Sequence, residues 1–239
     1  MAIAERMPRV RTDSVFYPVM AVAMTLVIFA GFAPSFYMKS VYNAPPELST
    51  LMIVHGAVFT TWMAIFIAQT TLVAGNRRDL HRTLGLVGFF VAGLMLILGM
   101  MLAVDALRRG FSPIANVPPA VFFVIPTGNI LVFIGILALG WINRARADYH
   151  KHYMLLANAA LLVPALARIL QHGFNAPNIV VAFALSDLVV VAVAIYDFAT
   201  RGKLHPATIW AGLALIASGP ALLMIGGSQA WHSFAMSLT

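Results

Sequence analysis

The chain has 239 residues, of which 61% are hydrophobic and only 10% are charged. A soluble domain carries about a quarter charged residues and needs far more polar surface, so a water-soluble globular protein is excluded. A disordered chain is excluded because it would be poorly hydrophobic and highly charged. The apolar runs are continuous over about twenty residues, as a helix that crosses the hydrocarbon core of a membrane requires.

These runs predict an all-α membrane protein with seven transmembrane helices in a single domain. In chain order, we expect the helices over residues 14–36, 48–74, 80–106, 117–143, 151–171, 177–198 and 206–225 of the 1–239 domain. Clusters of proline, glycine and asparagine separate them, and the connections are short. Pro126, Pro164 and Pro220 fall inside runs and are expected to kink their helices. One compact bundle without a soluble domain follows.

Lysine and arginine residues alternate between the two ends of this bundle. Eleven fall at one end, namely Arg6, Arg9, Arg11, Arg77, Arg78, Arg82, Arg144, Arg146, Lys151, Arg201 and Lys203. Three fall at the other end, namely Lys39, Arg108 and Arg109. Because cytoplasmic loops carry the excess of basic residues, the N-terminus is predicted to be cytoplasmic and the C-terminus outside. Topology thus accounts for the net charge of +7, and we expect membrane lipid and not nucleic acid as a partner.

The residue types that are missing limit the chemistry. The chain has no cysteine, which excludes Cys-ligated iron–sulfur clusters and covalently attached c-type haem. Its three lysines, Lys39, Lys151 and Lys203, lie at membrane edges, so a retinal Schiff base is not expected. Any bound metal would need histidine or oxygen ligands.

The seven histidines fall into two groups near opposite membrane faces. His55, His172 and His232 form the outer group, and His81, His150, His152 and His205 the inner one. Histidines on facing helices can hold a haem iron, which makes His55, His81, His150 and His172 candidate haem ligands. His55 and His172 are also candidates for a single metal ion. The alternative is that His81, His152 and His205 only face lipid headgroups, and that His55 is hydrogen-bonded within the membrane.

Two ionisable residues lie well inside the apolar runs. Arg168 is about one turn from the outer end of the fifth predicted helix, and Asp187 is near the middle of the sixth. Because these helices are consecutive and antiparallel, we expect a buried ion pair, either as a structural contact or as a proton or anion site. Other polar side chains are expected to line a cavity, namely Trp62, Gln69, Thr127, Asn129 and Asn158.

Three motifs resemble a family of uncharacterised bacterial integral membrane proteins with seven helices. They are HGAVFTTW at residues 55–62, LHRTLG at 80–85 and DYHKHYMLLA at 148–157. The resemblance implies a bacterial inner (cytoplasmic) membrane and no established activity. The pattern is also distantly similar to cytochrome b561-type membrane proteins, which implies haem b and electron transfer at His55 and His81. The fourth predicted helix lacks the histidine of that pattern, so His150 and His172 would have to substitute.

The leading interpretation is therefore a bacterial inner-membrane protein with a His-lined site. That site would bind haem b or a metal ion for electron transfer or membrane redox chemistry. Two alternatives stay open. One is a small-molecule or proton-coupled transporter or receptor that uses Arg168 and Asp187. The other is an accessory subunit of a larger membrane complex or a homo-oligomer. The sequence does not decide whether the protein is an enzyme.

Overall fold

The computed structural model describes residues 9–42, 47–112 and 117–239, with side chains described from residue 12. These ranges contain helices and no strand: α1 Arg9–Phe32, the π-helical segment η1 Ala33–Tyr37, α2 Lys39–Tyr42, α3 Thr50–Ala74, α4 Arg78–Arg108, α5 Pro119–Ile142, α6 Ala147–Ala159, α7 Leu162–Phe174, α8 Ile179–Arg201, α9 Pro206–Gly226 and α10 Gln229–Met236. Seven segments are long and apolar enough to cross a membrane, and α6 with α7 forms one of them. The predicted all-α, multi-pass membrane fold is confirmed.

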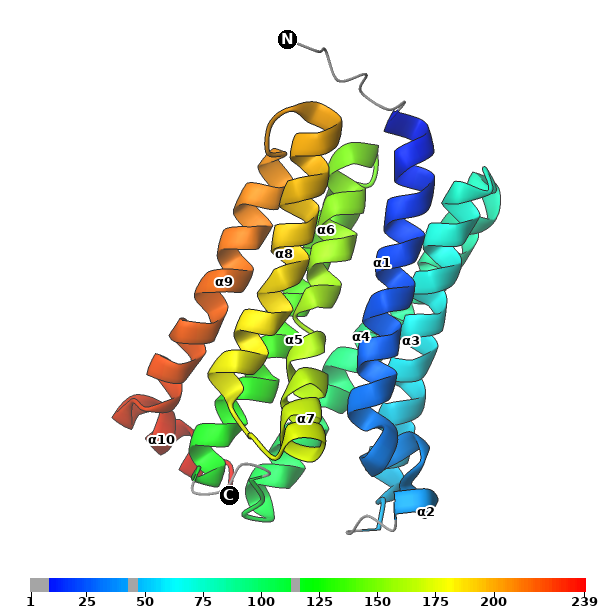
Figure 1. Cartoon of the computed structure of the whole chain (residues 1–239). Coiled ribbons are helices and arrows are strands. Elements are labelled where there is room, and N and C mark those ends of the chain that lie inside the picture. The colour runs from blue at the N-terminus through cyan, green and yellow to red at the C-terminus, as the bar shows by residue number, and fades with distance from the viewer. Residues whose placement is uncertain (1–8, 43–46, 113–116) are drawn as a thin grey trace.

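The α3–α4, α5–α6 and α8–α9 connections all lie at the end of the bundle where α1 begins (Figure 1). Arg77, Arg144, Arg146 and Lys203 belong to these connections, so we call this end the basic end. Segments η1, α2 and α10 and the end of α7 lie at the opposite end (Figure 1). The side chains of Arg6, Arg9 and Arg11, which entered the predicted topology, lie outside the described part of the chain.

The fourth and fifth membrane spans form the centre of the bundle. Helix α5 contacts α4, α6 and α9, while α7 packs between α1 and α8. The large buried side chains include Met95, Phe123, Phe133, Leu155 and Leu156. Apolar side chains such as Leu188, Ile195 and Trp210 instead point outward from α8 and α9, as lipid-facing positions require. Close packing around the central spans is what brings polar groups from distant parts of the chain together.

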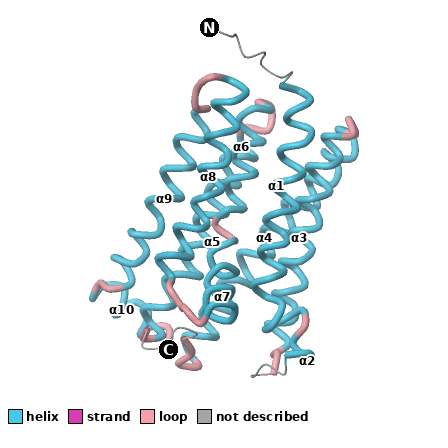
Figure 2. The backbone as a smooth tube through the Cα atoms, viewed as in Figure 1, coloured by secondary structure: helices cyan, strands magenta, loops and turns pink. Residues whose placement is uncertain are grey.

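The fifth membrane span is broken near its middle, between α6 and α7 (Figure 2). Pro164 has no backbone N–H to donate to the carbonyl four residues earlier, which weakens the helix there. The Ala160 and Leu161 amides bond to carbonyls only three residues back, at 3.2 and 3.1 Å. Ser186 Oγ of α8 donates to the Ala159 carbonyl at 2.7 Å, which satisfies a polar group at the break. The kink expected at Pro164 is therefore an interruption, whereas α5 and α9 continue through their prolines.

Candidate functional site

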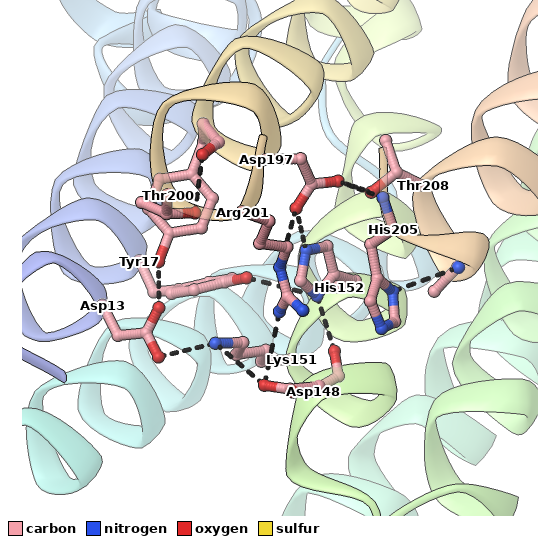
Figure 3. Close-up of polar contacts among 12 residues, drawn as sticks. Asp13, Tyr17, Asp148, Lys151, His152, Asp197, Thr200, Arg201, His205 and Thr208 are labelled. Carbon is pink, nitrogen blue, oxygen red and sulfur yellow. Dashed lines mark hydrogen bonds and ion pairs between the residues drawn. The ribbon is translucent and has the colours of Figure 1, made fainter. Parts of the chain in front are cut away.

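A network of bonded polar side chains lies at the basic end, where α1, α6, α8 and the start of α9 meet (Figure 3). Its members are Asp13, Tyr17, Asp148, Lys151, His152, Tyr196, Asp197, Arg201, His205 and Thr208. We call this set the His–Asp network. Helix α8 ends at Gly202, whose φ of +72° favours glycine. The chain then turns back, so that His205 caps α9 beside the last turn of α8.

His152 of α6 and Asp197 of α8 form the centre of this network. Both residues are 0% exposed. His152 Nε2 lies 2.8 Å from Asp197 Oδ1. The other carboxylate oxygen, Oδ2, accepts from Thr208 Oγ1 at 2.6 Å and from the His205 backbone amide at 3.0 Å. A buried carboxylate with this many donors is stabilised in its ionised form.

The partners of His152 fix the number of protons at the pair. Its Nδ1 lies 2.5 Å from the backbone carbonyl of Asp148, and its Nε2 faces the Asp197 carboxylate. A carbonyl oxygen and an ionised carboxylate can only accept, so both ring nitrogens must donate. The two contacts are satisfied together when His152 is an imidazolium beside ionised Asp197. Loss of one proton would leave a lone pair of the ring facing a carboxylate oxygen.

Charged neighbours balance this pair. Arg201 lies 3.3 Å from both Asp197 Oδ1 and Asp148 Oδ1, and is itself largely buried. Lys151 Nζ contacts Asp13 Oδ2 at 2.6 Å and Asp148 Oδ1 at 3.4 Å. With His152 protonated, three basic and three acidic side chains of the network cancel. Removal of that proton would therefore leave net negative charge in a region of low dielectric.

Two tyrosines extend the network to α1. The Tyr17 hydroxyl lies 3.5 Å from His152 Nδ1, and the Tyr196 hydroxyl donates to Asp13. The Phe16 and Tyr196 rings stack with their centroids 4.1 Å apart. Helix α1 is thus attached to α6 and α8 by both polar and aromatic contacts. A change in the charge of His152 would therefore alter the contacts at the start of α1.

His205 lies between the buried His152 and an open hollow at the basic end. Its ring stacks on His152, with centroids 4.4 Å apart and planes 19° from parallel, and its Nδ1 accepts from the Ala207 amide at 3.2 Å. Burial, and then the positive charges of His152 and Arg201, lower the pKa of His205 to about 4. His205 is therefore neutral, with its proton on Nε2. Together with Arg146, Asp148 and Tyr149, it lines an open hollow of about 360 Å³.

Two of the predicted haem ligands lie together at the basic end. The ring centroids of His81 on α4 and His150 on α6 are 6.0 Å apart, and the two ring planes are nearly perpendicular. His150 Nδ1 bonds to the Gly140 carbonyl at 2.9 Å, while His81 Nδ1 and Gln69 Oε1 are buried without a partner. Within residues 9–42, 47–112 and 117–239, no group of three or more His, Asp or Glu side chains is arranged to hold a metal ion.

The other two predicted ligands are not brought together. His172 is exposed near the end of α7. His55 packs on the Phe59 ring with centroids 4.3 Å apart, and its buried Nδ1 has no hydrogen-bond partner. Among the described contacts, none joins His55 to His172, so the structure does not provide the outer histidine pair that the sequence suggested.

The predicted ion pair between Arg168 and Asp187 is wrong for the described structure. Arg168 Nη1 donates to the Pro164 carbonyl at 3.0 Å, and the guanidinium carbon lies 4.3 Å from the centre of the Phe32 ring. Asp187 is half-buried on α8. The neighbour of Asp187, Ser186, faces α6, and one residue along a helix is a rotation of about 100°. Asp187 therefore points away from the surface that α8 shares with α6.

The polar residues expected to line a cavity belong to the packed interior instead. Trp62 Nε1 donates to Asn158 Oδ1 at 2.8 Å, and Asn158 Nδ2 donates to the Met154 carbonyl at 2.8 Å. Thr127 Oγ1 and Asn129 Nδ2 on α5 are buried without a partner. The hollow at the basic end is lined by different residues.

The sequence interpretation missed the His–Asp network. The alternative that His152 and His205 only face lipid headgroups is wrong, because His152 is fully buried and His205 is only 6% exposed. The signals available were the helical spacing of four between Asp148 and His152 and between Asp197 and Arg201. Neither spacing predicts that α6 and α8 pack together with these residues facing each other.

No protein-family model, curated protein or solved structure matches the chain. The resemblances to the bacterial membrane family and to cytochrome b561-type proteins therefore stay predictions.

Proposed function

We propose that the chain is a proton-coupled transport protein of a bacterial inner membrane, with the His152–Asp197 pair as its proton site. One observation carries this proposal: the pair is fully buried, both ring nitrogens of His152 face acceptors, and the network around it opens to a hollow through His205 and Asp148. A proton bound there is held by specific groups and is still close to water. Charged and polar groups of this kind inside membrane spans commonly form proton relays.

The same network supplies a mechanism by which a proton can change the structure. The pair joins α6 to α8, Asp197 also holds the start of α9, and Lys151 holds α1 through Asp13. Loss of the His152 proton weakens the contact between α6 and α8 and unbalances the charge of the network. A ligand that favours one of the two resulting arrangements is then coupled to the proton. In this proposal the basic end faces the cytoplasm, in agreement with the distribution of Lys and Arg.

Titration of the pair is the first test, because a carrier must release the proton that it binds. Infrared difference spectra of the purified protein between pH 5 and pH 9 should contain imidazolium and carboxylate bands that disappear in Asp197→Asn. Asp105→Asn is the matched control, because Asp105 is an acid at the opposite end with its own partner, Arg109 at 2.7 Å. A pair that exchanges no proton across this range would contradict the proposal.

Flux across a membrane is the second test. Vesicles with the protein and an internal pH indicator are given anions that stay ionised, such as diphenyl phosphate, succinate and inorganic phosphate, under an imposed pH gradient. At least one should drive proton entry, Asp197→Asn should reduce that entry to the level of empty vesicles, and Asp105→Asn should preserve it. Proton entry that is equal in Asp197→Asn and the wild type would rule out this pair as the proton site.

A second candidate function is redox chemistry at His81 and His150. The similarity to cytochrome b561-type proteins implies haem at His55 and His81, and His150 would have to substitute for the histidine missing from that pattern. The 6.0 Å separation of the His81 and His150 rings and the unpartnered His81 Nδ1 favour this candidate. The protein purified in detergent should then have a Soret band, or about one bound metal ion per chain, and His150→Asn should lose it. Absence of both from protein isolated under iron-replete conditions would exclude this candidate.

A further inference from the structure

Arg168 is a cation inside the fifth membrane span without an acidic partner among the described residues. Its one described hydrogen bond goes to the Pro164 carbonyl, and its guanidinium lies over the Phe32 ring. Arginine stays ionised and offers five N–H donors, most of which are unused here. An unpaired charge at this depth is costly and is usually retained for a ligand or a pathway.

Two more unpartnered polar atoms lie in the same region, at the end of the bundle opposite the His–Asp network. Both Ser35 Oγ on η1 and His55 Nδ1 on α3 are buried without a hydrogen-bond partner. His55 lies close enough to Arg168 for an electrostatic interaction. This end of the bundle therefore contains a hydroxyl group, a ring nitrogen and a cation for which the described residues provide no full set of partners.

Close packing holds the segments that carry these three residues against one another. A Cβ atom at Gly31 would clash with the Ala165 carbonyl oxygen, so α1 touches α7 about one turn before Arg168. A Cβ atom at Gly56 would clash with the Phe36 ring, so η1 touches α3 beside His55. The π-helical turn of η1 lies at this level, and such turns frequently occur at functional sites.

We propose that Arg168, His55 and Ser35 bind the oxyanion group of a small, singly charged molecule with an apolar body, a carboxylate or a phosphate ester. The planar guanidinium matches the two oxygens of such a group, and Ser35 and His55 add one hydrogen bond each. Phe32, Phe36 and Phe59 surround the site, which accounts for the apolar body. The same oxyanion chemistry occurs in a free organic acid and in the headgroup of an anionic lipid.

This site would hold the anion whose movement the proton drives. Its role as cargo site rests on the proposed transport function, whereas binding to Arg168 can be measured without any transport. Binding with no proton flux would contradict the transport function and leave the anion site. Proton flux with no binding that depends on Arg168 would contradict only the anion site.

Ligand-induced thermal stabilisation of the full chain in dodecyl maltoside tests the binding. Benzoate and diphenyl phosphate, a singly charged phosphate diester, should raise the unfolding temperature, while neutral benzamide, which has the shape of benzoate, should not. In a second measurement, the anionic lipid phosphatidylglycerol is added to the micelles in place of the soluble anion. Stabilisation by the lipid alone would identify a headgroup as the ligand, and stabilisation by benzoate would identify a free organic anion.

Arg168→Gln should weaken the apparent Kd for the anion by roughly tenfold to a hundredfold, the range for a lost hydrogen bond to a charged group. Without ligand this variant should be as stable as the wild type or more stable, because an unpaired buried charge has been removed. Arg109→Gln is the matched control, since Arg109 is exposed and paired with Asp105. The inference is overturned if no anion stabilises the wild type, or if Arg168→Gln responds as the wild type does.

Discussion

Replacement of Asp197 by asparagine and by alanine should have very different costs, because its carboxylate lies among four donors. Oδ1 accepts from His152 Nε2 at 2.8 Å and lies 3.3 Å from Arg201 Nε. Oδ2 accepts from Thr208 Oγ1 at 2.6 Å and from the His205 amide at 3.0 Å. The residue is 0% exposed, so water cannot replace any partner that is lost.

Asparagine can preserve most of these contacts. Its amide oxygen can accept from the two donors of α9, and its NH₂ group then faces His152 Nε2. His152 can respond as a neutral ring that donates from Nδ1 to the Asp148 carbonyl and accepts at Nε2. What is lost is the ion pair with Arg201, which keeps its 3.3 Å contact with Asp148, while the contact with His152 becomes a hydrogen bond between neutral groups. Loss of one contact between charged groups should lower the free energy of unfolding by about 1–3 kcal/mol.

Alanine removes every acceptor at once. His152 and Arg201 would keep buried positive charges, and the donors of Thr208 and His205 would have no partner. Breaking a buried ion pair by removal of one member costs about 3–5 kcal/mol, before the two neutral donors are counted. Asp197→Ala should therefore be less stable than Asp197→Asn by at least about 2 kcal/mol.

Reversible unfolding in mixed micelles, followed by circular dichroism as the fraction of dodecyl sulfate rises, measures this difference. Asp105→Asn and Asp105→Ala provide the control, because an exposed ion pair contributes about 0–1 kcal/mol and both variants should resemble the wild type. Equal losses of stability in Asp197→Asn and Asp197→Ala would refute the assigned roles of the two carboxylate oxygens.

Three further predictions concern other parts of the chain. Acidification from about pH 6.5 to about pH 4 should destabilise the wild type by at most about 3 kcal/mol more than His205→Asn, which keeps an acceptor at the helix cap. Because the pKa of His205 is lowered to about 4, the folded protein takes up this proton at lower pH than the unfolded chain does, and the free energy of unfolding decreases as the pH is lowered. Equal pH profiles for the wild type and His205→Asn in denaturant titrations would contradict this. Gly31→Ala should cost about 1–3 kcal/mol, because its Cβ would meet the α7 backbone, whereas Gly93→Ala, with nothing within 4 Å, should be neutral or stabilising; thermal unfolding that ranks them the other way would refute the packing. Asn158→Leu should cost about 1–3 kcal/mol by leaving the Trp62 N–H unpartnered, and a double-mutant cycle with Trp62→Phe should remove most of that cost; full additivity would exclude the bond.

The membrane spans could be predicted because hydrophobic length is a local property of the chain. The break in the fifth span could be predicted only in part. Pro164 marks the turn where the helix is weakened, yet whether the helix bends or separates depends on what satisfies the freed backbone groups. That partner is Ser186 of the next span, whose hydroxyl bonds to the Ala159 carbonyl. A contact between residues so far apart leaves no trace in the hydrophobic pattern.

The polar sites were harder to predict because the rotation of each helix is set by packing. His152 follows Lys151 in the sequence, which suggests an interfacial position, but its ring turns inward to Asp197 of α8. Arg168 was expected to meet Asp187 because their helices are neighbours in sequence. Arg168 instead faces Phe32 of α1, because α7 packs on α1 as well as on α8. The sequence located Arg168 inside a span without identifying what it contacts, and it did not identify the buried His152 and Asp197 as a pair.

The two proposed binding sites belong to one broken span. His152 lies on α6 and Arg168 on α7, separated by about 24 Å along a helix at about 1.5 Å per residue, with the break between them. Helix α6 packs mainly on α5 and α9, whereas α7 packs mainly on α1, and α8 contacts both halves. A change in charge at His152 acts on the α6 contacts, and the interruption allows α7 to reorient without strain in a continuous ladder of backbone hydrogen bonds. A transport protein needs this combination, because its two sites must influence each other while a barrier between them is preserved.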